Sequence, residues 1–221
     1  VGGAPWVVGG ECAFRANRET AECVYDDLGG EMKELQKVAT PEMKTIEDVC
    51  AFLSADTKRS VKAVVYQKET DDKYVVAFVR GDIEVNEVKL RNYLRSEIYP
   101  AQELEKAGLV AGFIGPRGLS SQVQAVYDIS LKTCPDLICG ANEEGYHLTG
   151  LNMDRDVGSV EYTDIGKAVQ EGICPVCGKR SLSLTRGIEV GNIFQLGDKY
   201  TSSMGMKYID KDGTLKTPIM G

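Results

Sequence analysis

Histidine is almost absent from this chain of 221 residues, because His147 is the only one. A metal site built from several histidines is therefore excluded. The sequence also lacks Gly-x-Ser-x-Gly, the turn that presents the nucleophile in many serine hydrolases. A Ser–His–Asp triad would have to use His147, so catalysis by a serine nucleophile is poorly supported.

Positive charge and long apolar runs are scarce as well. Lysines and arginines number 26 against 33 aspartates and glutamates, which gives a formal net charge of −7. This balance argues against a basic face for generic nucleic-acid binding, but it allows a small contact with one end of a nucleic acid. No apolar run approaches the roughly 20 residues of a membrane span, and we expect no signal peptide. We therefore expect a cytoplasmic protein without a membrane partner.

What remains is an ordinary globular composition, with 43% hydrophobic and 27% charged residues. The length suits one large domain or two small ones. The chain starts at Val1 instead of methionine, and it stops at Gly221 directly after the apolar residues 218–220. These ends lead us to expect a piece of a longer protein.

The seven cysteines form an odd and irregularly spaced set, which speaks against a disulfide framework. Cys174 and Cys177 have the spacing of metal ligands, but structural zinc usually needs two such pairs. The other close pair, Cys134 and Cys139, is poorly spaced for a metal. The sequence therefore favours a turn without metal at residues 174–178, with a redox Cys-x-x-Cys as the alternative, and we assign no metal ligand.

Short helical and strand patterns alternate along the chain. Apolar spacing predicts helices over residues 45–53, 87–94 and 100–106. Thr45 and Asn86 are suitable capping residues for the first two helices. β-Branched or alternating stretches predict strands over residues 61–67, 73–80, 122–128, 146–151 and 160–162. Hairpins mixed with helices favour an α+β fold over a doubly wound sheet.

The remaining stretches are less regular. Residues 131–141 are predicted to be helical or rich in turns. Towards the end of the chain, the pattern predicts strands over 181–185 and 188–196, and a closing hairpin from 208–209 and 214–219.

The stretch from Ala111 to Gly118 is the densest turn signal, and it contains Gly112, Gly115 and Pro116. Glycine permits a positive φ or a close backbone approach, and proline fixes its own φ. Such a loop can aim several N–H groups at one anion or developing oxyanion. A plain connection between a helix and a strand is the simpler interpretation, because these residues mark turns more often than sites.

Two single residues have both a plain and a functional interpretation. Lys62 lies in an apolar strand, where alternation makes an outward-facing lysine easy; functionally, it would contact a phosphate. His147 follows Tyr146 in another strand, and it is either a packed histidine or a wall of a small pocket. Residues 80–90 are dense in polar groups of both signs, which on their own indicate a capped helix entry with a solvated face.

Taken in order, these residues resemble the bacterial type of prolyl-tRNA synthetase. The resemblance covers most of the chain and rests on residues 45–53, 79–90, 111–116, 140–156 and 186–200. It implies a YbaK-like editing domain, inserted into a class II catalytic domain, with a mixed and largely antiparallel sheet and surrounding helices. The implied segments are 1–27 (catalytic domain), 28–44 (linker), 45–165 (editing domain) and 166–221 (catalytic domain).

The resemblance also implies an activity, which is hydrolysis of alanine mischarged onto proline tRNA. Alanine is smaller than proline, and a few methylenes supply only about 1–3 kcal/mol of discrimination. A second, smaller site that admits alanine and rejects proline would supply the rest. The implied partners are the acceptor end of tRNA(Pro) and the alanine ester, and the parent enzyme would be a homodimer. The parent would use ATP and Mg²⁺ for ligation, whereas editing would need no cofactor.

Six residues carry implied roles in editing. Gly112, Gly115 and Pro116 would line the site, with loop N–H groups facing the aminoacyl ester and the terminal adenosine. Lys62 would neutralise a phosphate at the tRNA end, and His147 would shape the alanine pocket. Asp128 matches an acidic position on the neighbouring strand. The nucleophile would be water, assisted by backbone groups and by a ribose hydroxyl of the substrate.

The sequence departs from the family at two places. Asn192 replaces the histidine of Gly-His-Ile-Phe, and Cys12 occupies the histidine position of Ser-His-Glu-Phe. These changes weigh against proline activation, and we expect no aminoacylation by this chain, because it lacks the stretches that would hold the class II motifs. Two alternatives stay open. One is a non-catalytic tRNA-docking module with a decayed editing site. The other is a free-standing trans-editing protein, against which the signature at 186–200 argues.

Overall fold

The computed structural model describes residues 4–188, 191 and 193–221. The chain divides into two compact units, of which the larger is Pro5–Thr185 and the smaller consists mainly of Arg186–Gly221. Asn192 and part of the strand predicted over 188–196 lie outside the described residues.

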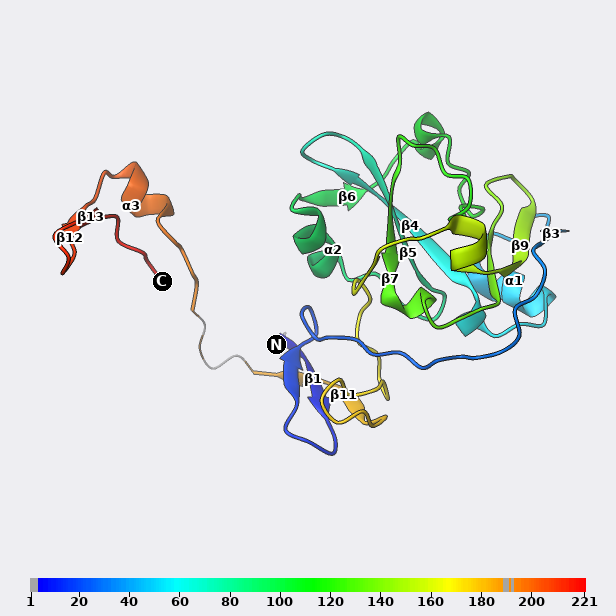
Figure 1. The fold of residues 1–221 in the computed structure, drawn as a ribbon, viewed down its shortest axis with the longest axis horizontal. Coiled ribbons are helices and arrows are strands. Elements are labelled where there is room, and N and C mark those ends of the chain that lie inside the picture. The colour runs from blue at the N-terminus through cyan, green and yellow to red at the C-terminus, as the bar shows by residue number, and fades with distance from the viewer. Residues whose placement is uncertain (1–3, 189–190, 192) are drawn as a thin grey trace. The chain divides into compact units, whose positions relative to one another are not determined.

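A five-stranded sheet forms the centre of the larger unit, in the order β10-β7-β5-β4-β6. Its strands are β4 (Val61–Lys68), β5 (Tyr74–Arg80), β6 (Ile98–Pro100), β7 (Gln124–Asp128) and β10 (Tyr162–Thr163). β4 pairs antiparallel with β5, which confirms the predicted hairpin, while β5 and β7 run parallel. Figure 1 shows β4, β5 and β7 side by side in this unit.

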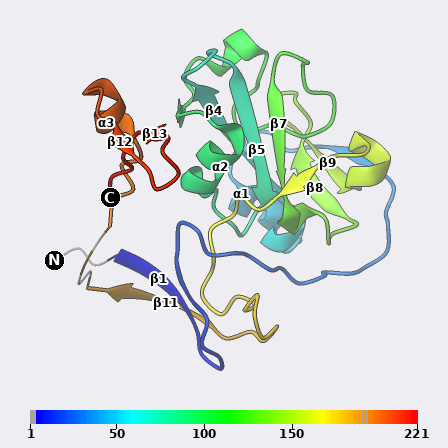
Figure 2. The same ribbon diagram turned by 60° about the vertical axis from the view of Figure 1, so that its left-hand side comes forward.

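A second sheet has three antiparallel strands in the order β3-β9-β8. They are β3 (Gln36–Ala39), β8 (Leu137–Gly140) and β9 (Tyr146–Leu151). An isolated parallel bridge joins Ser60 to Ile138, so β8 comes beside the start of β4. The turned view in Figure 2 shows β8 and β9 together. The two sheets therefore meet where β4 begins.

Apolar side chains cover both faces of β5, from the second sheet on one side and from a helix on the other. On one face, Phe78 packs in a cluster that includes Leu137 and Leu151 of the second sheet. On the other face, Val79 packs with Leu90 of helix α2 (Glu87–Leu94). This burial on both sides explains why β5 reads as a continuous apolar run.

The two helix starts that the sequence predicts are confirmed. In α1 (Ile46–Phe52), Thr45 Oγ1 accepts a hydrogen bond from the Asp48 N–H at 3.1 Å. In α2, Asn86 Oδ1 accepts from the N–H groups of Val88 and Lys89 at 3.1 and 3.2 Å. These bonds satisfy N–H groups that have no partner within the helix.

Four single helical turns complete the larger unit. Three are 3₁₀ turns and the last is a π turn: Thr57–Arg59, Leu104–Ala107, Ile129–Leu131 and Met153–Val157. A small sheet in the order β11-β1-β2 combines two strands from the start of the chain with one strand that follows the two larger sheets in the sequence. Its strands are β1 (Ala4–Gly9), β2 (Arg15–Asn17) and β11 (Leu182–Gly187).

The smaller unit contains α3 (Lys199–Ser203) and an antiparallel hairpin of β12 (Tyr208–Ile209) and β13 (Leu215–Lys216). The hairpin confirms the closing pair predicted from the sequence. The described residues between 191 and 196 form no strand, so that prediction is wrong for them. Helix α3 was not indicated by the apolar spacing.

The predicted α+β class is confirmed, although some local predictions are wrong. The pattern predicts no strand within 28–44, yet β3 lies there, and β8 replaces a helical or turn-rich stretch. The helix predicted over 100–106 is shorter, because β6 includes Pro100 and only Leu104–Ala107 is helical. The class II strands and the four predicted segments stay predictions. No helix in the described part of the chain has both the length and the apolarity needed to cross a membrane.

Candidate functional site

A cavity of about 250 Å³ lies where the two sheets of the larger unit meet. Its walls come from the start of β4, the residues that open α1, the loop at 111–118, the end of β8, and β9. Three of the six residues assigned from the sequence line it: Lys62, Gly112 and His147. They come together from positions up to 85 residues apart in the sequence only because the sheets pack in this way.

Lys62 reaches the cavity from β4, and its Nζ donates a hydrogen bond to the carbonyl oxygen of Ile83 at 3.0 Å. The side chain is half-buried. A lysine held in this way keeps two further N–H donors for an anion. The ammonium group is thus positioned before any ligand binds.

His147 is buried in β9, opposite Val38 of β3 and Gly140 of β8. Its Nδ1 forms a 2.7 Å hydrogen bond with Thr40 Oγ1, and its ring lies 5.3 Å from that of Phe113. Burial lowers the pKa of His147, because the charged imidazolium loses its hydration there. The ring is therefore a neutral, oriented wall near pH 7.

Gly112 needs to be glycine for two reasons. Its φ is +84°, a conformation that side chains disfavour. A Cβ on Gly112 would also lie 2.9 Å from the Cβ and Cγ of Lys44, another residue that lines the cavity. The backbone here runs directly against the segment that leads into α1.

Gly115 and Pro116 are buried, and neither of them lines the cavity. A Cβ on Gly115 would lie 1.8 Å from the carbonyl oxygen of Gly140, so the glycine permits the loop to touch β8. The Gly115 N–H donates to Asn142 Oδ1 at 2.8 Å. In this structure, Gly115 fixes the position of the loop, and its N–H is already paired.

The other N–H groups of the loop divide into two kinds. Phe113 donates its N–H to the Val110 carbonyl oxygen at 2.9 Å. The N–H groups of Gly112 and Ile114 have no hydrogen-bond acceptor among the described residues. Both residues also line the cavity.

Asn142 holds the loop in place, and the sequence alone gave it no role in the site. Its Nδ2 donates to the carbonyl oxygens of Gly115 and Arg117 at 3.1 and 2.8 Å. Its backbone N–H donates to the carbonyl oxygen of Phe113 at 2.8 Å. Its φ is +55°, which asparagine tolerates better than most residues. The signal for it was the stretch 140–142 of the family resemblance.

Asp128 is fully buried at the end of β7, and it is not among the residues that line the cavity. Its Oδ1 accepts the N–H of Ser130 at 2.9 Å, and its Oδ2 accepts the N–H of Ile165 at 2.8 Å. Burial raises the pKa of Asp128, although these hydrogen bonds oppose the shift. The observed contacts link β7 to the segment after β10.

Arg80 shows that the polar stretch 80–90 is only partly solvated. Asn86 caps α2 as expected, but the Arg80 side chain is 4% exposed. It forms a bidentate ion pair with Asp82, at 2.6 and 2.9 Å. The solvated-face interpretation is therefore wrong for Arg80, because its guanidinium lies under the Tyr25 ring.

Comparisons with known proteins agree with this architecture. Residues 40–156, more than half of the chain, match the family described as aminoacyl-tRNA editing domain. The chain is 41% identical over 216 residues to the proline–tRNA ligase of Caldicellulosiruptor bescii, which covers 95% of this chain and 37% of that protein. It is 40% identical over 217 residues to the proline–tRNA ligase of Magnetococcus marinus, and this match covers 95% of this chain and 38% of that protein. The chain thus spans well under half the length of these relatives.

Solved structures share the fold of the larger unit. One, assigned as a trans-editing enzyme for prolyl tRNA synthetase, has a TM-score of 0.53 and 16% identity, and covers 61% of this chain and 87% of its own. The structure of the hypothetical protein APE2540 matches with a TM-score of 0.54 and 16% identity, and the match covers 61% of this chain and 92% of that chain. At such identities the likeness concerns the fold alone. The family match and the ligase relatives together establish that the chain belongs to the aminoacyl-tRNA editing family, as a relative of the bacterial proline–tRNA ligases.

Proposed function

We propose that this chain hydrolyses the aminoacyl ester of mischarged alanyl-tRNA(Pro). The observation that supports the proposal is that Lys62, His147, Gly112 and Ile114 all line one cavity of about 250 Å³, while the N–H groups of Gly112 and Ile114 have no acceptor among the described residues. Ligand pockets for drug-sized molecules run to about 300–1,000 Å³, so this one suits a small group. An alanyl side chain is such a group.

The cavity offers a partner for each part of an aminoacylated tRNA end. The Lys62 ammonium group pairs with a phosphate, and the burial of its stem keeps it in place. The N–H groups of Gly112 and Ile114 donate to the ester oxygen, on which negative charge develops during hydrolysis. His147 closes the side of the pocket that would otherwise admit a proline ring.

Water serves as the nucleophile in this proposal. The neutral His147 ring has one nitrogen paired with Thr40, so it orients the pocket wall and does not form a triad with a serine. Loss of a single oxyanion-hole donor costs about 2.7–4 kcal/mol in a hydrolase where it was measured, so donors of this kind can contribute strongly. A ribose hydroxyl of the substrate supplies further assistance to the attacking water.

Asp128, Gly115 and Pro116 have supporting roles in the same proposal. Asp128 holds Ile165 and the end of β7, and the loop depends on the close approach of Gly115 to Gly140. Pro116 restricts the backbone that follows. The chemistry itself then belongs to Gly112 and Ile114.

The whole protein's activity is a separate part of the proposal. We propose that it ligates proline to tRNA(Pro) as a cytoplasmic homodimer, with ATP and Mg²⁺ for ligation and no cofactor for editing. Among the described residues, the one group placed to share a metal ion consists of three cysteines, and thiolates do not suit Mg²⁺. No editing step in this proposal runs through Mg²⁺ or ATP.

The test is deacylation of alanyl-tRNA(Pro) by the purified chain, with prolyl-tRNA(Pro) as the competing substrate. The expected result is release of alanine well above spontaneous hydrolysis, while prolyl-tRNA(Pro) stays intact. Binding of the tRNA end without hydrolysis would instead support a docking module whose editing site has decayed. A rate equal to that of spontaneous hydrolysis, together with no binding of the tRNA end, would contradict both the editing function and the docking function.

A further inference from the structure

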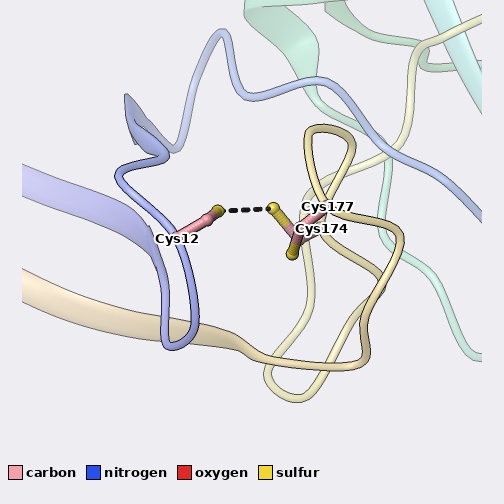
Figure 3. Close-up of side chains that lie close together, drawn as sticks. All are labelled: Cys12, Cys174 and Cys177. Atoms are coloured by element: carbon pink, nitrogen blue, oxygen red, sulfur yellow. Dashed lines mark hydrogen bonds between the residues drawn. The ribbon is translucent and has the colours of Figure 1, made fainter.

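Three cysteines come together outside the editing cavity (Figure 3). Cys12 lies in the turn between β1 and β2, while Cys174 and Cys177 lie in the turn that precedes β11. Their Sγ atoms all lie within 4.8 Å of one another, and Cys12 Sγ is 3.5 Å from Cys174 Sγ. The sequence shows only the pair at 174 and 177, because the third cysteine is 162 positions away.

The backbone around Cys174 is folded as a tight knuckle. The Gly178 N–H donates to the Cys174 carbonyl oxygen at 2.9 Å, and the Cys174 N–H donates to the Lys179 carbonyl oxygen at 2.8 Å. The N–H groups of Cys177 and Val176 donate to the Cys174 sulfur within this turn. Such N–H donors stabilise a thiolate, which is the form that binds metal.

A glycine lies against the sulfurs, and an arginine lies close to the turn that holds Cys12. Gly9 faces the sulfurs, and a Cβ there would lie 3.0 Å from Cys12 Sγ and 3.5 Å from Cys174 Sγ. Arg15 donates to the carbonyl oxygen of Cys12 at 3.3 Å, and Lys179 is paired with Glu11 next to the turn. A divalent ion with three thiolates carries a net charge of −1, which the nearby Arg15 offsets, since the charge of Lys179 is already balanced by Glu11.

We propose that Cys12, Cys174 and Cys177 bind one Zn²⁺ ion as thiolates. Zinc binds cysteine sulfur at about 2.3 Å in a tetrahedral arrangement, which places the sulfurs about 3.8 Å apart. The observed spacing fits that arrangement with small movements of the side chains. Each thiol releases its proton to solvent on binding, and a water molecule takes the fourth position.

The position of the site defines its effect. Cys12 precedes the family match at 40–156 and the other two ligands follow it, so the ion clamps together the two segments that flank the editing domain. Closing so long a loop by a metal stabilises the folded chain through the entropy of the unfolded one. The site belongs to the small β11-β1-β2 sheet, and it acts independently of the proposed editing chemistry.

The test is metal binding by the full chain, purified under reducing conditions and freed of metal by a chelator. Zn²⁺ added to this protein is expected to bind one ion per chain, and Co²⁺ is expected to give thiolate-to-cobalt charge-transfer bands. Cys12→Ala and Cys177→Ala should each lower zinc affinity at least tenfold, whereas Cys139→Ala, a buried cysteine outside the cluster, should not. Chelation should lower the thermal midpoint of the wild type but not that of Cys12→Ala.

Cys12 is only partly buried, so its alanine variant is expected to fold even if changes at Cys174 do not. Unchanged zinc affinity in Cys12→Ala would overturn the proposal, as would a failure of the wild type to bind zinc. A stable disulfide between Cys12 and Cys174 under the same reducing conditions would also overturn it. Loss of the cobalt bands in both variants, with the bands kept in Cys139→Ala, would support it.

Discussion

Thr40 Oγ1 and His147 Nδ1 form a 2.7 Å hydrogen bond between two buried side chains. Thr40 directly follows β3, and His147 lies in β9, so the bond joins neighbouring strands at the wall of the cavity. It fixes the plane of the imidazole ring and occupies one of its two nitrogens. The wall of the proposed alanine pocket is therefore rigid and uncharged.

Acidification should destabilise the chain through His147. The pKa of this residue is lowered in the folded state, so below about pH 6.5 the unfolded state binds more protons than the folded state. The free energy of unfolding should thus be at its full value above pH 6.5 and fall as the pH drops towards the folded pKa. The slope from one such group is at most about 1.4 kcal/mol per pH unit.

Urea unfolding from pH 7.5 to 5 measures this effect, with His147→Gln as the comparison. Glutamine can still pair with Thr40 but does not titrate, so the variant should lose less stability on acidification. Identical pH profiles for the two proteins would show that His147 does not couple to folding.

Replacing His147 with alanine should relax the rejection of prolyl-tRNA(Pro). The smaller side chain enlarges the cavity on the side that would hold the proline ring. Because pocket size discriminates by about 1–3 kcal/mol, the preference for alanyl over prolyl substrate should fall at least tenfold. Deacylation of both substrates measures the ratio. Full protection of prolyl-tRNA in this variant would mean that another residue excludes proline.

Replacing Lys62 with methionine should weaken editing and reduce its dependence on salt. A hydrogen bond to a charged group is worth about 1.5–3 kcal/mol, so kcat/KM should drop at least tenfold. The slope of log affinity against log salt should also flatten by about 0.7, the value for one phosphate of a single strand. Lys73→Met, an exposed lysine outside the cavity, is the matched control. An unchanged slope would remove the phosphate role.

Gly115→Ala should destabilise the larger unit. The new Cβ would lie 1.8 Å from the Gly140 carbonyl oxygen, so the loop and β8 must separate. Overpacking of this kind costs about 1–3 kcal/mol, measurable by urea unfolding. Gly191→Ala is the control, because its Cβ would meet no atom of the described residues within 4 Å. Equal stability of the two variants would contradict the close approach of loop and strand.

Asp128→Asn distinguishes a structural from a catalytic role. Asn places an NH₂ group against either the Ser130 or the Ile165 N–H, so one buried hydrogen bond is lost at a cost of about 1–3 kcal/mol. We expect lower stability in urea with editing retained well below the unfolding transition. Lost editing with unchanged stability would instead assign Asp128 to the chemistry.

Local sequence signals predicted the elements whose partners are near in the chain. The β4–β5 hairpin follows from β-branched residues around a polar turn, and α2 begins after Asn86 because that residue caps it. β3 escaped prediction because its four residues include Gln36 and Lys37, and its partner β9 lies more than 100 residues later. The proximity of Cys12 to Cys174 escaped prediction for the same reason, since only the folded chain brings these two cysteines together.

The same limit applies to the candidate site. Lys62, Gly112 and His147 could be named from the family resemblance, and the structure brings them to one cavity. Thr40 could not be named, and the resemblance includes Asn142 without giving it a role, because the importance of both residues lies in hydrogen bonds that only the packed loop and sheets create. Tertiary contacts, not local propensity, decide which polar groups remain free for a ligand.

The edge position of β3 has a consequence for any attempt to isolate the editing domain. A shortened chain that begins at residue 45 would lack β3 and leave β9 as the new edge of its sheet. That edge would expose the backbone N–H and C=O groups beside His147 and Leu148 to other chains. Such a fragment should aggregate by strand pairing, whereas one that starts before Gln36 should stay monomeric in light scattering.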